Sequence, residues 1–185
     1  MAAERVPQPL MVDVIPMRRR HLRSVLRIEA QVYPRPWSMS LFMSELALRS
    51  TRAYFVARIG REVVGYAGLM MTMEDGHVTT IAVDPKWHRE QIGTRLMLGL
   101  AREARIRDAE NLTLEVRLSN KGAQAMYRQF GFAPVGIRKN YYAETSEDAL
   151  VMWSREIGTP AYGELLHGLE RRLRGHTRYE EPKRW

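Results

Sequence analysis

Residues Thr79–Phe132 decide the fold of this chain, and they read TTIAVDPKWHREQIGTRLMLGLAREARIRDAENLTLEVRLSNKGAQAMYRQFGF. An Asp-Pro pair stops a first apolar run, a basic turn opens a helical pattern, and a second apolar run and a shorter helix follow. This alternation of strand-like and helix-like patterns predicts an α/β unit. The expected bounds are 79–83 for the first strand, 86–94 for the basic turn, 91–107 for the helix, 112–117 for the second strand and 120–130 for the second helix.

The basic turn has the composition of an anion site. A helix that begins near Gln91 leaves its first amide N–H groups without intrahelical partners. These donors, the helix dipole and the side chain of Arg89 together favour phosphate oxygens. Gly93 lets the backbone approach a ligand closely. The alternative is an ordinary corner between a strand and a helix, with a glycine that faces the helix packing.

The segments around this unit predict a mixed sheet. Three successive strands with short links, at 53–59, 62–71 and 77–83, imply an antiparallel meander, whereas the helical link at 91–107 implies a parallel crossover. Further strands are expected at 11–15, 133–139 and 148–153. The expected fold class is α/β (α+β mixed), with a mostly antiparallel sheet of about six or seven strands flanked by helices.

Two helices are expected before the meander, at His21–Gln31 and Met39–Leu48, and Ser38 can cap the second. The link between them, Tyr33-Pro34-Arg35-Pro36-Trp37, is too rich in proline for a helix. It is either a loop over a substrate cleft or a rigid surface connection, and the pattern leaves both open.

The last strand is followed by a helix and a tail. Thr159 followed by Pro160 is typical of a helix start, and the basic residues Arg174–Trp185 are either solvated or in contact with a partner. The expected organisation is a disordered leader at 1–10, one domain at 11–155, and a C-terminal helix with a basic tail at 156–185.

Composition restricts the class of protein and of site. The 185 residues suit one domain with a sizeable core, and no apolar run reaches the roughly 20 residues of a membrane span. The absence of cysteine excludes disulfides, thiolate metal sites and a cysteine nucleophile, and it fits the cytoplasm. The five histidines show no metal-ligand spacing, so no metal is expected.

The chain is basic, with 29 Lys and Arg against 21 Asp and Glu and a net charge of +8. Such a surface attracts phosphates, nucleic acid or acidic partners, and it is also what many solvated arginines produce. A nucleic-acid partner requires a located basic patch, so direct nucleic-acid binding is not expected from the charge alone.

Two side chains in the opening stretch have the chemistry of proton transfer. Glu115 lies in the middle of a probable central strand, on the same face as Thr113 and Arg117, so it either faces a cleft or pairs with Arg117. Tyr127 lies on the apolar stripe of the helix at 120–130, where a tyrosine is more often a core residue than a catalytic one.

Together, residues 12–153 resemble the GNAT superfamily of N-acetyltransferases, and within it the RimI-type ribosomal-protein alanine N-acetyltransferases. The Leu-Glu-Val-Arg and Asn-Tyr-Tyr segments are much more specific than the glycine turn, which the whole superfamily shares. The motifs that carry the resemblance are Ile81-Ala82-Val83-Asp84-Pro85, Ile92-Gly93, Leu114-Glu115-Val116-Arg117, Ser119-Asn120, Ala125-Met126-Tyr127, Gly131-Phe132, Arg138-Lys139-Asn140-Tyr141-Tyr142 and Glu147-Asp148-Ala149.

The resemblance implies a sheet whose strands at Ile81 and Leu114 splay apart to admit acetyl-CoA. Glu115 matches the family's general base and Tyr127 its general acid, and no metal takes part. Residues of the aromatic link and of the strand after Arg138 are expected to bind the substrate, namely Tyr33, Trp37 and Tyr141. The residues expected to bind the cofactor are Ile81, Ala82, Val83, Arg89, Glu90, Gln91, Ile92, Gly93, Thr94 and Asn120.

The sequence departs from the superfamily pattern in the turn. The pattern is Gln or Arg, two residues, Gly, one residue, then Gly or Ala, and here these positions hold His88, Gln91 and Gly93. If the backbone of Gln91 lies in the ordinary helical region, where side chains are tolerated, its N–H is still presented to a ligand. If the position needs a positive φ, the loop must differ.

These features predict an acetyl-CoA-dependent Nα-acetyltransferase that acts on a protein N-terminus, with the N-terminal alanine of a small-subunit ribosomal protein as the expected acceptor. One alternative is the same fold acting on a lysine or a small-molecule amine. A second is a non-catalytic regulatory module that binds acetyl-CoA, and a third is a nucleic-acid-binding protein.

Overall fold

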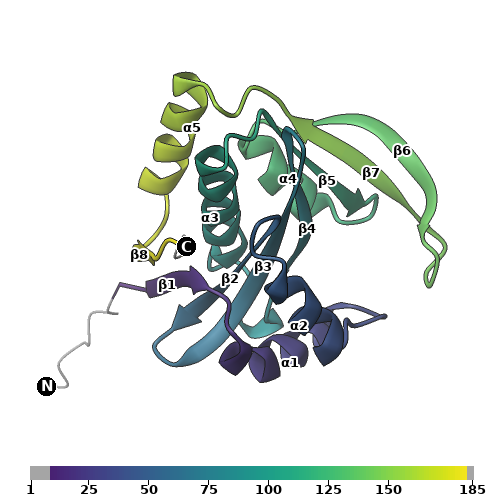
Figure 1. Cartoon of the computed structure of the whole chain (residues 1–185), viewed down its shortest axis with the longest axis vertical. Coiled ribbons are helices and arrows are strands. Elements are labelled where there is room, and N and C mark those ends of the chain that lie inside the picture. The colour runs from purple at the N-terminus through teal and green to yellow at the C-terminus, as the bar shows by residue number, and fades with distance from the viewer. Residues whose placement is uncertain (1–8, 183–185) are drawn as a thin grey trace, which may run out of the picture.

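The computed structural model describes residues 9–182, and one eight-stranded sheet runs through them in the order β6-β7-β5-β4-β3-β2-β1-β8 (Figure 1). The strands are β1 (Met11–Pro16), β2 (Arg52–Ile59), β3 (Glu62–Thr72), β4 (Asp75–Val83), β5 (Asn111–Arg117), β6 (Ala133–Tyr142), β7 (Glu147–Ser154) and β8 (His176–Tyr179). The helices are α1 (Leu22–Val32), α2 (Met39–Ala47), α3 (Ile92–Ile106), α4 (Lys121–Gln129) and α5 (Pro160–Arg171), with short 3₁₀ turns η1 (Arg19–His21) and η2 (Pro85–Trp87).

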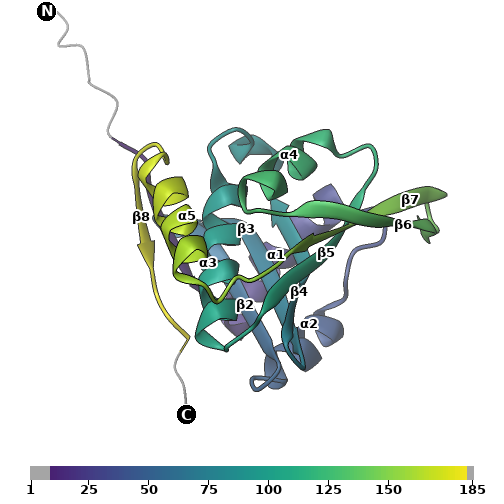
Figure 2. The same ribbon diagram turned by 90° about the horizontal axis from the view of Figure 1, so that it is seen from above.

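Helices cover both faces of the sheet, and two hydrophobic cores result. Along β2, Tyr54 and Val56 belong to the core under α1 and α2, whereas Phe55 and Ala57 belong to the core under α3. This alternation is what a strand buried on both faces requires. Seen from above, α3, α4 and α5 lie on the face opposite α1 (Figure 2).

The predicted fold class is confirmed, because β2, β3 and β4 form an antiparallel meander and β4 pairs with β5 in parallel through the α3 crossover. The sheet has one strand more than the upper expected number. The predicted leader at 1–10 falls almost wholly on residues 1–8, which lie outside the described residues.

The extra strand comes from the basic tail at Arg174–Trp185, for which the sequence left a solvated end and a partner contact open. β8 pairs with β1 in parallel, in register from Met11 opposite His176 to Val14 opposite Tyr179. Arg178 also forms an ion pair with Asp13 on β1, at 3.0 Å. The tail therefore covers the edge that β1 would otherwise expose.

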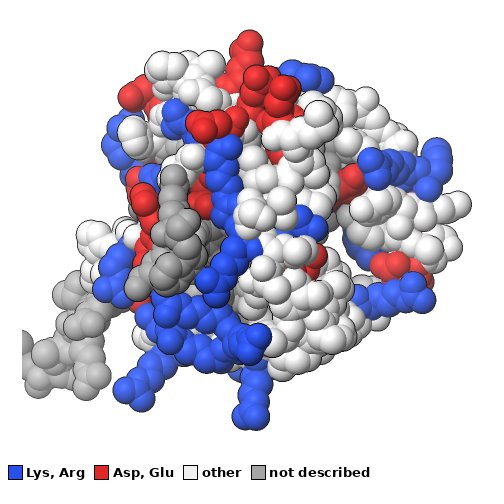
Figure 3. All heavy atoms as spheres, in the orientation of Figure 1, with Lys and Arg blue, Asp and Glu red and all other residues white. Residues whose placement is uncertain are grey.

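Charge is spread unevenly over the surface. On the face of Figure 3, basic side chains gather over β1 and α1, and acidic side chains gather around α5 at the top. On this face, the basic side is the one that an anionic partner would approach.

The sheet opens at its centre. β4 and β5 pair only from Asp75 opposite Asn111 to His77 opposite Thr113, although both strands continue beyond these residues. Just past this point β4 carries a bulge, because the register with β3 skips Thr79 between Val78 and Thr80. A bulge bends its strand, which directs the end of β4 away from β5.

Gly68 on β3 allows this bulged region to pack. A Cβ added there would lie 2.3 Å from Cε1 of Tyr54 and 2.6 Å from Oγ1 of Thr79. We therefore expect Gly68→Ala to lower the free energy of unfolding by about 1–3 kcal/mol, the usual effect of overpacking, as measured by urea denaturation.

Gly136→Ala on β6 is the matched control. A Cβ there meets nothing within 4 Å, so its effect should stay within about 0.5 kcal/mol. Equal effects of the two substitutions would contradict the close approach of Tyr54 to β3.

Candidate active site

A cavity of about 980 Å³ occupies the gap between β4 and β5. Its walls come from the two parted strands, the starts of α3 and α4, the link after α1, and the Tyr141–Glu144 region between β6 and β7. Because the strands stop pairing after His77 and Thr113, each keeps a backbone edge whose N–H and C=O groups have no partner strand. Such edges suit a ligand with amide groups of its own, because each buried backbone group needs a partner.

The start of α3 forms one end of this cavity. Asp84 caps η2 by accepting from the N–H of Lys86 at 3.1 Å, and Pro85 takes its first position. The first described backbone hydrogen bond of α3 runs from Arg95 N to Gln91 O at 3.1 Å. Hence the N–H groups of the residues between them are free of intrahelical partners, as an anion site requires. These residues, Ile92, Gly93 and Thr94, all line the cavity.

Of the two conformations left open for Gln91, the structure has the one with a positive φ. Its φ is 58° and its ψ is 23°, which is the left-handed region, and Arg89 also has a positive φ of 66°. The chain turns from η2 into α3 through these residues, and neither is a glycine. The superfamily glycine thus stands at a position that does need a positive φ.

Gly93 has a packing role. A Cβ there would lie 3.2 Å from Sδ of Met126 on α4 and 3.9 Å from Cγ2 of Val83. The glycine lets α4 approach the first turn of α3, which agrees with the alternative of a glycine that faces the helix packing.

Glu115 points into the cavity but does not pair with Arg117. Its side chain is 8% exposed, with Oε2 3.1 Å from Nε2 of His77 and Oε1 3.3 Å from a guanidinium nitrogen of Arg138. The hydrogen bond from His77 lowers the pKa of Glu115 more than burial raises it, and Arg138 adds to the lowering. Arg117 instead binds Glu144 and Glu147.

His77 was missed by the sequence reasoning, which treated the histidines as scattered. Its Nδ1 lies 2.8 Å from Oγ1 of Thr113, its neighbour in the last paired register of β4 and β5. The signal lay in the parallel pairing, since β4 and β5 start in register and Glu115 is two residues beyond Thr113 on the same face. Identifying His77 as the partner of Glu115 required the register between β4 and β5, which cannot be read from the sequence.

Tyr33, Tyr127 and Tyr142 line the cavity close to one another. Burial raises the pKa of Tyr127 above its usual range, and the phenols of Tyr33 and Tyr142 raise it further. Tyr33 donates a hydrogen bond to the carbonyl oxygen of Ile81 at 3.0 Å, so the link after α1 is tied to β4. All three hydroxyls stay protonated at neutral pH.

The structure brings most of the expected site residues to this cavity. Glu115 and Tyr127 both line it, as do Tyr33, Trp37 and Tyr141 of the expected acceptor site, so the aromatic link does border a cleft. Of the expected cofactor residues, all line the cavity except Glu90, namely Ile81, Ala82, Val83, Arg89, Gln91, Ile92, Gly93, Thr94 and Asn120.

Two of these residues have partners that limit what they can do. The carbonyl oxygen of Glu90 accepts from Arg95 at 2.7 Å, outside the cavity wall. Oδ1 of Asn120 caps α4 by accepting from Ala123 N at 3.1 Å, so the side-chain amide nitrogen of Asn120 is the group left for a ligand.

Glu29 is a second buried carboxyl of the cavity that the sequence reasoning missed. Only 2% of the residue is exposed, and Oε1 accepts from the backbone N–H of Trp37 at 2.8 Å. Oε2 has no hydrogen-bond partner among the described residues. Burial therefore raises the pKa of Glu29 from 4.5 to about 7, despite the N–H of Trp37. Its position on the apolar face of α1, next to Ile28, was the available signal.

The cavity fits a long, phosphorylated, amide-containing ligand. It combines unpaired strand edges with a helix N-terminus, and the described residues contain no group of three or more side chains that could hold a metal ion. Within the same residues no helix is long and apolar enough to cross a membrane. Acetyl-CoA has amides in its pantetheine arm and phosphates at its far end, so its chemistry matches both features.

Comparison with known proteins agrees with this geometry. Residues 22–132 match the acetyltransferase (GNAT) family. The chain belongs to this family. As a GNAT protein it is an acetyl-CoA-dependent N-acetyltransferase, which confirms the predicted enzyme class and cosubstrate.

Relatives of this GNAT protein carry the narrower names that the sequence led us to expect. It is 38% identical over 140 residues to the N-alpha-acetyltransferase RimI of Mycobacterium tuberculosis. The aligned region spans 72% of this chain and 85% of that relative. It is 33% identical over 133 residues to the ribosomal protein bS18-alanine N-acetyltransferase of Escherichia coli, across 71% of this chain and 88% of that protein.

Solved structures show the same likeness. The crystal structure of the ribosomal-protein-S18-alanine N-acetyltransferase from Escherichia coli superimposes with a TM-score of 0.71 at 30% identity, covering 79% of this chain and 94% of that chain. An N-acetyltransferase from Thermoplasma acidophilum in complex with coenzyme A shares the fold with a TM-score of 0.66 at 13% identity.

The raised pKa of Glu29 makes stability depend on pH. Folding favours the protonated carboxyl, so the contribution of Glu29 to the free energy of unfolding is greatest below about pH 4.5 and is lost as pH rises through about 7. Between pH 5 and pH 8, ionisation of Glu29 should lower the free energy of unfolding by on the order of 2 kcal/mol. Glu29→Gln should abolish this decrease, as measured by urea denaturation at both pH values.

Glu62→Gln is the control for this comparison, since Glu62 is exposed on β3. Its pH dependence should match that of the wild type. A Glu29→Gln variant with the wild-type pH dependence would show that Glu29 ionises as readily in the folded chain as in the unfolded one.

Proposed function

We propose that this enzyme transfers the acetyl group of acetyl-CoA to the α-amino group of a protein N-terminus, and that the N-terminal alanine of a small-subunit ribosomal protein is its acceptor. The observation that carries the proposal is Glu115, held by His77 at the point where β4 and β5 part, in the same cavity as Tyr127. The names of the relatives support the acceptor. The reaction is proposed to take place in the cytoplasm.

Acetyl-CoA would be held along the parted strands. The backbone edge of β4 from Ile81 to Val83 would bind the pantetheine arm mainly through its N–H groups, because the carbonyl oxygen of Ile81 already accepts from Tyr33. The side-chain amide nitrogen of Asn120 would lie beside it. The first turn of α3 would hold the pyrophosphate through its N–H groups. When bound, acetyl-CoA supplies an activated thioester carbonyl, and a backbone N–H near Val83 would stabilise negative charge on its oxygen.

Glu115 would accept the proton of the incoming amine, directly or through one water molecule. Its lowered pKa makes it a weaker base than an ordinary glutamate. An α-amine has a pKa of roughly 8, so about a tenth of it is neutral at pH 7, whereas lysine with a pKa of about 10.4 is almost wholly charged. A weak base therefore suits an N-terminus better than a lysine side chain.

Tyr127 would supply a proton to the leaving thiolate. Its raised pKa keeps the phenol protonated at the pH values at which the α-amine loses its proton. Tyr127 therefore remains the proton donor and Glu115 the proton acceptor. Proton donation by a positioned side chain contributes about 10²–10⁴-fold to the rate. No covalent enzyme intermediate is needed, and the chain has no cysteine to form one through a thiol.

The acceptor would enter past the aromatic link. Tyr33 and Trp37 line the cavity from the end of α1, and Tyr141 lines it from β6, 45% exposed. These rings lie on the same cavity as Glu115, which is where the amine must reach. Aromatic side chains offer a large contact area to a bound peptide.

Mass spectrometry of acetyl transfer tests this proposal. We would incubate the enzyme with acetyl-CoA and peptides that differ in the first residue, each with one internal lysine. We expect a single acetyl group on the N-terminal residue, most rapidly on alanine. Glu115→Gln and Tyr127→Phe should each lower kcat by at least about 100-fold, because each removes a proton-transfer group.

Two variants serve as controls. Glu147→Gln removes a carboxylate that binds Arg117 and Ser119, and Tyr162→Phe removes a buried hydroxyl that donates to Phe130 O at 3.0 Å. Neither touches the proposed reacting atoms, so kcat should fall by less than about threefold. Acetyl groups on the internal lysine would contradict the acceptor, and unchanged rates in Glu115→Gln would contradict the base.

A further inference from the structure

The segment after α5 returns to the turn that precedes α3. The backbone N–H of Arg174 donates to Oε1 of Gln91 at 2.9 Å, and its guanidinium donates to the carbonyl oxygen of Arg89 at 2.7 Å. The same guanidinium lies 4.0 Å from a carboxylate oxygen of Glu90. One residue thus holds all three residues of the turn, although more than 80 positions separate them in sequence.

Arg95 joins the turn before α3 to the segment after α5 through hydrogen bonds of its buried side chain. This arginine is fully buried, and it donates to the carbonyl oxygen of Glu90 at 2.7 Å, to Oγ1 of Thr177 at 2.9 Å and to the carbonyl oxygen of Arg174. A buried guanidinium must have its donors satisfied, and these acceptors come from the turn and the C-terminal segment. Removing the segment would therefore leave Arg95 without most of its partners.

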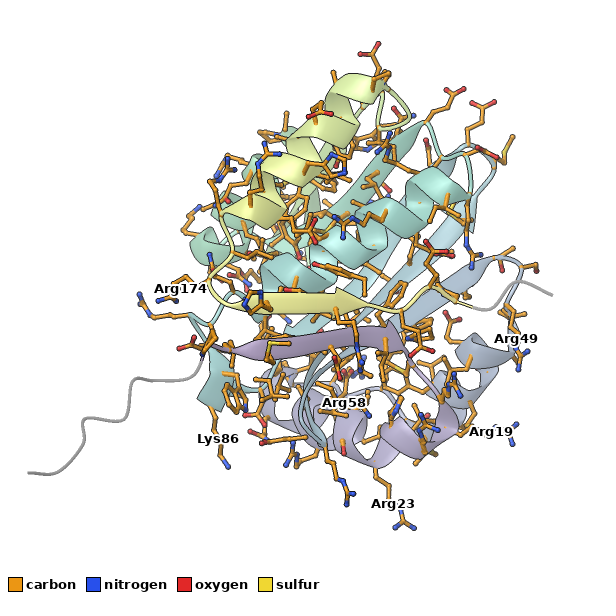
Figure 4. All side chains as sticks on the ribbon, turned by 90° about the vertical axis from the view of Figure 1, so that its left-hand side faces the viewer. Arg19, Arg23, Arg49, Arg58, Lys86 and Arg174 are labelled. Carbon is orange, nitrogen blue, oxygen red and sulfur yellow. The ribbon has the colours of Figure 1, made fainter. Side chains whose placement is uncertain are left out.

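The C-terminal segment is itself anchored. Gly175 has a φ of +76°, and a Cβ there would lie 2.3 Å from the carbonyl oxygen of Leu10, so the chain bends tightly as β8 begins beside β1. Further on, the hydroxyl of Tyr179 donates to the carbonyl oxygen of Arg95 at 3.3 Å. Figure 4 shows Arg174 at the start of β8, on the same side of that view as Lys86. Arg174 is thus presented to the turn from an anchored segment that leads into β8.

The turn needs support of this kind, because Arg89 and Gln91 both adopt positive φ without being glycine. The superfamily pattern has glycine at the position of Gln91, where no support is required. The residues that match the GNAT family end at Phe132, well before Arg174. The support therefore comes from outside the matched region.

We infer that Arg174 is a positioning residue for acetyl-CoA: it holds the turn at Arg89–Gln91 in its left-handed conformation, so that the N–H groups at the start of α3 face the phosphates. This inference rests on the proposed cofactor site. The C-terminal segment takes over the conformational role that glycine has in the superfamily pattern. Arg174 does not line the cavity, so its action is through the turn.

Coenzyme A binding, measured by titration calorimetry, tests the inference without any acceptor. We expect Arg174→Ala to raise the Kd about tenfold and the KM for acetyl-CoA by a similar factor, while kcat changes less than about twofold. Arg172→Ala, which removes an exposed arginine at the end of α5, should leave all three unchanged. Arg174→Lys, which keeps a donor for the carbonyl oxygen of Arg89, should restore part of the affinity.

A double-mutant cycle in a background that carries both Arg89→Gly and Gln91→Gly separates positioning from other roles. Glycine adopts positive φ unaided, so in this background, where neither residue of the turn needs support, Arg174→Ala should raise the Kd by about threefold or less. An equal loss of affinity in both backgrounds would overturn the inference. So would an unchanged Kd in the Arg174→Ala variant.

Dephospho-coenzyme A, which lacks the 3′-phosphate, provides the second discrimination. If Arg174 acts through the turn, Arg174→Ala should weaken this ligand and coenzyme A by the same factor. A loss confined to coenzyme A would show direct contact with the 3′-phosphate and would overturn the positioning role. A wild-type enzyme that binds neither ligand would instead contradict the proposed cofactor site.

Discussion

The parting of β4 from β5 is the constraint on which the rest of the structure depends. Two parallel strands in the middle of a sheet normally pair along their length, but here pairing stops after His77 and Thr113. The bulge at Thr79 bends β4, and Gly68 on β3 leaves the space that Thr79 and Tyr54 occupy. The gap leaves unpaired backbone groups in the interior, and a ligand with amide groups satisfies them. The fold thus creates a binding site where the facing edges of β4 and β5 have no partner strand.

The same point of separation fixes the electrostatics. His77 is the last paired residue of β4, and its ring binds both Thr113 and Glu115 on β5. The hydrogen bond and Arg138 keep Glu115 ionised, whereas burial keeps Tyr127 protonated. The proposed base and acid share one cavity, so their pKa values must differ widely for one to stay ionised while the other stays protonated. Glu29 extends this pattern toward the acceptor side, where burial without a second partner raises its pKa to about 7.

Much of this could be predicted from the sequence, because strand alternation, the Asp-Pro stop and the helix patterns are local signals. Strand alternation left Glu115 facing either a cleft or Arg117, and the helix pattern favoured a core position for Tyr127. Their roles as base and acid came from the family resemblance that the surrounding motifs carry. What could not be predicted depends on register or on distant segments. The partner of Glu115 required the β4–β5 register, since Arg117 is nearer in sequence but faces Glu144 and Glu147. The tail reads as polar and basic, and only the free edge of β1 makes it a strand.

A crystal structure of the enzyme with a bisubstrate analogue, coenzyme A joined to the N-terminal nitrogen of an alanine peptide, tests the central claim most directly. The account predicts the pantetheine arm between β4 and β5, the pyrophosphate at the first turn of α3, and the alanine nitrogen within about 3 Å of Glu115 or joined to it by one water molecule. An analogue bound elsewhere, or an alanine nitrogen on the side of the cavity away from Glu115 and Tyr127, would contradict it.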